Sequence, residues 1–201
     1  MRKLLLLASL VTVLVPAATH AQLDLGVRGG WAFAMGDAVK NSSLSDAVKW
    51  QIPIQLDAMY RLTPELSVGA YGSYGFGILG DRLDDACDAI NADCSSNAWR
   101  VGIQAAYAVN QLKSMTLSPW VGIGTGWEWL KVKSPGSEAT SNGWEYVNFQ
   151  LGADYKVNKQ LALGPFVQYS IGQFRTIEGN EIPDKGTHEW FTVGLRGLFA
   201  L

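Results

Sequence analysis

Apolar and polar residues alternate along most of this chain. From Leu23 to Phe33 every odd position is apolar or glycine, whereas the even positions are small or charged. The same period of two returns from Trp50 to Arg61 and in six later segments. Such alternation is typical of β-strands with one apolar face. It predicts strands at residues 23–33, 50–61, 65–78, 98–109, 116–130, 145–157, 160–173 and 189–201.

The segments between these strands alternate in length. The long ones are 34–49, 79–97, 131–144 and 174–188, and the short ones are 62–64, 110–115 and 158–159. Long and short connections must then lie at opposite ends of an up-and-down meander. Tyr60, Tyr107 and Tyr155 recur at nearly equal spacing just before short turns, which indicates a repeated hairpin. The predicted fold class is therefore all-β, an eight-stranded antiparallel up-and-down barrel.

Alternation alone does not decide which face of the barrel is apolar. A lipocalin-like barrel turns its apolar side chains inward around a ligand, whereas an outer-membrane barrel turns them outward to lipid. Here the aromatic residues of the apolar face gather at strand ends, as in the girdles of transmembrane barrels. That face is also nearly free of charge, and a basic residue on it would cost about 2–4 kcal/mol at the midplane. Both features favour lipid outside.

The opposite face combines glycine with long polar side chains, which suits the narrow interior of an eight-stranded barrel. Gly29-Gly30-Trp31 does satisfy the short Gly-x-Trp pattern associated with lipocalins. A three-residue match is weak evidence in a chain with 22 glycines and 8 tryptophans. We therefore predict a transmembrane barrel over residues 22–201.

Residues 1–21 have the composition of a secretory signal. Arg2 and Lys3 precede an apolar run that is too short for a bilayer core, which needs about 20 residues, and a small-residue segment ends at Ala21. Removing the two basic residues changes the formal net charge from −2 to −4, and no basic run occurs elsewhere. Nucleic acid is therefore excluded as an expected partner.

Cys87 and Cys94 are the only cysteines. In a secreted chain such a pair predicts one disulfide. After cleavage the only histidine would be His188, so a zinc site lacks donors and no metal or other cofactor is expected. The loop around these cysteines contains five aspartates; a divalent cation could bridge them to lipopolysaccharide phosphates, but their spacing fits no defined calcium loop and favours a solvated acidic loop.

Ionisable residues on the inner face should pair, because unpaired buried charges are costly. Arg100 and Glu128, near the loop ends of adjacent strands, form the favoured pair. The set could act as a polar plug or as a gated pore, and the narrow interior favours the plug. The predicted lumen network comprises Arg28, Asp57, Arg100, Glu128, Asp154 and Arg196, with Arg61 and Lys156 as further inward charges.

A catalytic role would need a histidine positioned beside a nucleophile or water. His188 is the sole candidate and is expected to be an exposed loop histidine. Trp190 stands where lipid A deacylase-like barrels carry serine, and Gly186 stands where outer-membrane proteases carry aspartate. No enzyme is therefore predicted. Pro119 and Pro165 fall within predicted strands, and a bulge or local irregularity is expected at Pro165.

In its strand pattern, and most clearly in "LSPWVGIGTGWEW" (117–129) and "LGADYKVNKQLALGPFVQY" (151–169), the chain resembles small outer-membrane barrels such as the OmpA transmembrane domain and OmpX-like proteins. The resemblance implies insertion by the outer-membrane assembly machinery, which reads a C-terminal strand usually ending in an aromatic residue. Here Phe199 lies two residues before the final Leu201.

These observations together predict a monomer in a Gram-negative outer membrane, in contact with its lipid and lipopolysaccharide. Its four long loops would be extracellular, and its role would be membrane integrity or the binding of a surface ligand. A narrow porin-like channel for small solutes is the alternative, and a barrel lipid hydrolase is the third hypothesis.

Overall fold

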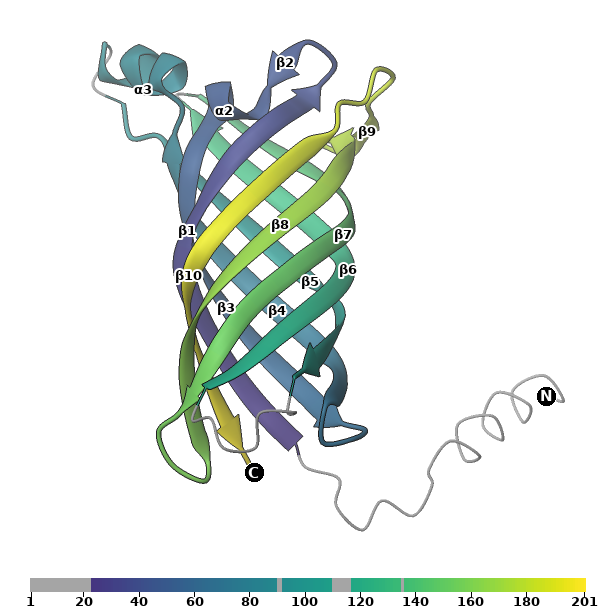
Figure 1. The fold of residues 1–201 in the computed structure, drawn as a ribbon. Helices are drawn as coiled ribbons and strands as arrows, with labels where there is room; N and C mark the ends of the chain where they lie inside the picture. Colours follow the sequence, from purple (N-terminus) through teal and green to yellow (C-terminus); the bar gives the residue numbers. More distant parts are fainter. Residues whose placement is uncertain (1–22, 90–91, 110–116, 135) are drawn as a thin grey trace, which may run out of the picture.

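The protein forms a single β-barrel that is closed all round (Figure 1). The structure is a computed structural model that describes residues 23–89, 92–109, 117–134 and 136–201. The predicted signal segment and the predicted turn at 110–115 lie outside the described residues. The elements are β1 (Leu23–Val39), β2 (Ser42–Ser43), α2 (Leu44–Ala47), β3 (Val48–Arg61), β4 (Leu66–Leu79), α3 (Asp81–Asp88), β5 (Ser95–Ala108), β6 (Leu117–Ser134), β7 (Ser137–Lys156), β8 (Leu161–Ile177), β9 (Asn180–Glu181) and β10 (His188–Ala200).

The eight long strands among the described residues pair in chain order and antiparallel. The last strand, β10, pairs with both β8 and β1, so no long strand is left at an edge. In the closing pair Asp24 lies opposite Ala200 and Gly36 lies opposite His188. The eight-stranded up-and-down barrel predicted from the alternation is confirmed.

Side-chain burial alternates along each strand, with the polar face inside. In β3, for example, Gln55 and Asp57 are buried, whereas Ile54 and Leu56 are 48% and 62% exposed. Aromatic side chains such as Trp99 and Trp144 lie exposed toward the end with long loops. Tyr60, Tyr107 and Tyr155 lie exposed beside the short turns. An apolar exterior around a polar interior is the arrangement of a barrel in lipid, so the predicted direction of the apolar face is confirmed.

The segment 131–144, predicted to be a long loop, is instead a β-hairpin. β6 continues to Ser134 and β7 begins at Ser137, so the two strands pair well beyond the predicted ends. Lys131 and Glu138 form an ion pair at 2.6 Å across this extension. Opposite charges and alternating side chains stabilise such a strand pair, which explains why the polar composition did not make a loop.

The β7–β8 pairing is interrupted at Pro165 and Gly164, as the predicted local irregularity requires, but no bulge is present. The register of β7 with β8 is the same on both sides, with Gly152 opposite Phe166 and Tyr155 opposite Leu163. On its other side Pro165 lies opposite Leu195 in an unshifted register. The β7–β8 register shifts near the loop end instead, between Glu145 and Val147.

The segments at the long-loop end form a structured cap over the barrel (Figure 1). The amide of Gly80 donates to the carbonyl of Ala47, and Val39 bridges to Lys185, so three of the four loop segments are connected by backbone contacts. The predicted Cys87–Cys94 disulfide is present and is confirmed; it connects α3 to the segment before β5. Within the described ranges, no helix has both the length and the hydropathy needed to cross a bilayer.

Candidate functional site: the barrel lumen

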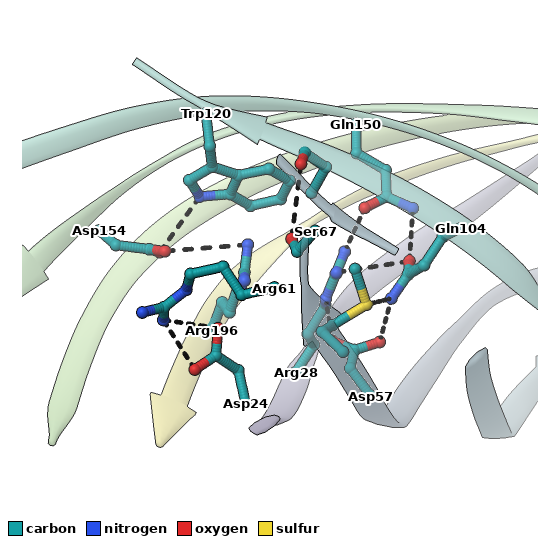
Figure 2. A network of polar contacts seen from close by, with 12 residues as sticks. Asp24, Arg28, Asp57, Arg61, Ser67, Gln104, Trp120, Gln150, Asp154 and Arg196 are labelled. Carbon is teal, nitrogen blue, oxygen red and sulfur yellow. Dashed lines mark hydrogen bonds and ion pairs between the residues drawn. The ribbon is translucent and has the colours of Figure 1, made fainter. Parts of the chain in front are cut away.

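A hydrogen-bonded network centred on Asp57 fills the middle of the lumen (Figure 2). Arg28 Nε donates to Asp57 Oδ2 at 2.6 Å, and its Nη1 donates to Gln150 Oε1 at 2.7 Å. The side-chain amides of Gln55 and Gln104 each donate to Asp57 Oδ1 at 2.8 Å. Both ions of this pair are almost completely buried, so their mutual contact and these amides replace the water lost on folding.

Two glycines show why the inner face needs residues without side chains. A Cβ at Gly26 would lie 2.8 Å from Asp57 Oδ2, and one at Gly152 would lie 2.6 Å from the Trp120 ring. Larger residues would therefore displace the carboxylate and the indole. The mixture of glycine and large polar residues noted in the sequence is a packing requirement of this narrow interior.

A second group of charges lies toward the short-turn end. Arg61 Nη2 donates to both carboxylate oxygens of Asp24 at 2.7 Å. Trp120 Nε1 donates to Asp154 Oδ1 at 3.1 Å, and Arg196 Nη1 lies 3.8 Å from Asp154 Oδ2 (Figure 2). Asp24 was not among the predicted network residues, although its even position on β1 places it on the same inward face as Arg28.

A third group surrounds Glu128 near the long-loop end. Its Oε1 accepts from Arg100 Nη2 at 3.2 Å and from Trp190 Nε1 at 3.1 Å, and His188 Nε2 lies 3.2 Å from its Oε2. Arg100 and Glu128 lie directly opposite each other on β5 and β6. The structure thus places the six predicted lumen residues in three pairs: Arg28 with Asp57, Arg196 with Asp154, and Arg100 with Glu128.

The prediction that His188 is exposed is wrong. Its exposed fraction is 1%, and its ring stacks on Phe174 with centroids 4.1 Å apart. The reason is the length of β10, which begins at His188 itself and turns this side chain inward with Trp190 and Arg196. The same even-numbered parity in the sequence was the signal that could have shown this.

Glu145 and Tyr71 are also buried near this group, and the Tyr71 hydroxyl donates to a carboxylate oxygen of Glu145. Tyr71 shares the odd parity of the inward Ser73, so the sequence contained a signal for it. No such signal exists for Glu145, because its odd position is that of the lipid-facing residues of β7. The register shift between Glu145 and Val147 turns it inward.

An apolar cluster seals the lumen beneath the cap. Its members come from the strand ends and the loop segments and include no ionised group; they are Ala32, Ala34, Leu44, Val48, Ala98, Leu130, Phe174, Ile182 and Trp190. Above it, Lys185 donates a hydrogen bond to Glu181 at 2.9 Å and lowers the pKa of that exposed carboxyl. The loop end of the barrel is therefore closed by packed side chains.

The free space in the lumen is unequally distributed. A void beside Arg28 and Arg100 measures about 10 Å³, room for about one water molecule. At the short-turn end a cavity of about 540 Å³ opens. Within the described residues, no three histidine, cysteine or acidic side chains are arranged to hold a metal ion. Among the described residues, the larger free space therefore lies at the short-turn end, and the middle is occupied by the network around Asp57.

The comparison with sequence families decides the class of the protein. The profile described as "Outer membrane protein beta-barrel domain" matches residues 4–195. The chain belongs to this family. It is accordingly an outer-membrane protein that crosses the membrane with its strands. No curated protein sequence matches the chain.

Solved outer-membrane barrels share the fold. Neisserial surface protein A (NspA) is 13% identical, with 87% of this chain and 95% of that chain covered and a TM-score of 0.58. The outer membrane protein AlkL is 13% identical, with 93% and 94% covered and a TM-score of 0.53. Ail, the attachment invasion locus protein of Yersinia pestis, is 11% identical, with 89% and 99% covered and a TM-score of 0.50. At such identities the likeness shows the fold alone.

Proposed function

We propose that this family member is a non-enzymatic, non-conducting barrel that acts through its extracellular cap, in membrane integrity or in binding a surface ligand. The short turns would face the periplasm, after insertion as a monomer by the outer-membrane assembly machinery. The observation that carries the proposal is the occupied lumen, in which Arg28, Asp57 and their amide partners are buried and hydrogen-bonded to one another, beside a void with room for about one water molecule. A barrel filled in this way supports a role for its outer surfaces.

The surroundings of His188 support the non-enzymatic part of the proposal. Its Nε2 faces Glu128, and its Nδ1 has no hydrogen-bond partner among the described residues. No hydroxyl or thiol is therefore activated by it in the described part of the chain, and nucleophilic catalysis needs such a contact. Stacked on Phe174 and 1% exposed, the ring is also out of reach of lipid. The lipid-hydrolase hypothesis therefore has little support.

Replacing the loop segment 81–94 with a Gly-Ser linker tests the proposed role of the cap. Cells that lack the protein and are complemented with the wild type should regain resistance to a large antibiotic that the outer membrane excludes. Cells with the loop variant should not, because the acidic α3 and its disulfide are removed while the barrel strands are kept. Heat-modifiable gel mobility should show equal amounts of folded barrel. Full resistance with the loop variant would contradict the proposal.

A narrow channel remains the second candidate because the cavity of about 540 Å³ opens at the short-turn end. A channel would also require the apolar cluster around Leu44 and Trp190 to part, together with the network around Asp57. Conductance separates the two candidates, since a closed lumen passes no ions.

A further inference from the structure

The cavity at the short-turn end is lined by charged groups at different depths. Trp120, Asp154 and Arg196 line it from within the strands. Lys156, the last residue of β7, and Lys159, in the turn that follows, also line it closer to the opening. Among the described residues neither lysine forms an ion pair with a carboxylate. The cavity thus has cationic groups from its opening to its inner end.

Arg196 is buried without enough acceptors. It is 5% exposed, and its guanidinium lies over the Trp120 ring at 4.3 Å. Among the described residues its Nε and Nη1 atoms have no hydrogen-bond partner, and the 3.8 Å to Asp154 exceeds a hydrogen bond. A guanidinium carries five donors, and leaving them unmet in a buried position is costly.

The environment of Arg196 favours an added negative charge. Arg196 lies directly opposite Arg28 on the neighbouring strand, and like charges in that arrangement repel. Arg28 donates hydrogen bonds to Asp57 and Gln150. The carboxylate beside Arg196 is that of Asp154, and it also accepts a hydrogen bond from Trp120. The positive charge of Arg196 is therefore the less neutralised of the two.

We propose that this cavity binds a small solute through a carboxylate or phosphate group, with Arg196 as the principal donor. The planar guanidinium matches the paired oxygens of such groups, and the two lysines attract the anion toward it. Nε and Nη1 are packed away from solvent, so the guanidinium turns toward the cavity on binding and gives up its long contact with Asp154. Because the carboxylates of Asp24, Glu65 and Asp154 also line the cavity, the unmet donors of Arg196, rather than net charge, select the anion.

The indole N–H signal of Trp120 reports on this site, because that group donates to Asp154 beside Arg196. We expect it to shift saturably when folded full-length protein in lipid nanodiscs is titrated with inorganic phosphate or with succinate at constant ionic strength. Arg196→Gln should weaken the binding about tenfold or more, the effect of losing a charged hydrogen-bonded pair. Arg175→Gln removes one positive charge from an exposed position near the loop end of β8 and should leave the affinity unchanged.

The two anions distinguish the chemical classes of ligand. A shift with phosphate alone assigns a phosphate ligand, a shift with succinate alone assigns a carboxylate, and a shift with both assigns a general oxyanion site. If Arg196→Gln does not fold, Lys156→Gln should still weaken binding, because one of the two cations near the opening is lost. The proposal would be overturned if neither anion produced a saturable shift. It would also be overturned if Arg196→Gln bound the anion as tightly as the wild type, or if Lys156→Gln did so where Arg196→Gln does not fold.

Discussion

Replacing Asp57 with alanine should lower the free energy of unfolding by about 3–5 kcal/mol, the usual cost of removing one partner of a buried ion pair. Asp57 accepts from Arg28 at 2.6 Å and from the amides of Gln55 and Gln104 at 2.8 Å. The substitution leaves the charge of Arg28 and two amide donors unmet in the middle of the lumen. Urea-induced unfolding in lipid vesicles, followed by tryptophan fluorescence, measures the loss.

Asp81→Ala is the matched control for this measurement. Asp81 also pairs with a basic residue, Lys49, at 2.7 Å, but both side chains are more than half exposed to solvent. Such surface pairs contribute about 0–1 kcal/mol. Equal effects of the two substitutions would show that Asp57 is not isolated from water, and the account of a packed polar lumen would fail.

Replacing Ile103 with arginine should lower the free energy of unfolding by about 2–4 kcal/mol. Ile103 is 65% exposed and lies midway along β5 between Trp99 and Tyr107, which mark the two ends of the apolar band. An arginine there would place its charge near the middle of the hydrocarbon. The same unfolding measurement in vesicles reports the effect.

Leu62→Arg provides the comparison on the outer surface. Leu62 is 53% exposed in the short turn after β3, where charges reach the membrane–water interface. There the cost of arginine should fall to about 0–1 kcal/mol. If Ile103→Arg were as mild as Leu62→Arg, the exposed face of β5 would not face lipid.

The barrel was predictable from the sequence because one physical constraint repeats along every strand. Each strand must present apolar side chains to lipid. The outward direction of one residue, such as Leu25 or Leu195, therefore determines the direction of every other residue in its strand. Alternation within β3 and within β10 likewise places Asp57 and Arg196 in the lumen. Which charge meets which was predictable only where two residues lie directly opposite, as Arg100 and Glu128 do.

The remaining differences arise where local structure departs from simple alternation. The register shift beside Glu145 reverses its direction, and a shift of this kind leaves no clear mark in residue type. The hairpin at 131–144 continues the ladder of β6 with β7 and includes pairs such as Lys131 with Glu138, which composition alone does not reveal. The packing of Leu44 and Ile182 into the cap joins loops far apart in sequence.

Conductance in planar lipid bilayers tests most directly the central claim that side chains close the lumen. Folded protein, verified by heat-modifiable gel mobility, should leave the current at the level of a protein-free bilayer, because the void beside Arg28 and Arg100 has room for about one water molecule and not for a hydrated ion. Stable, stepwise channels from the folded barrel would contradict this account and would favour the solute channel.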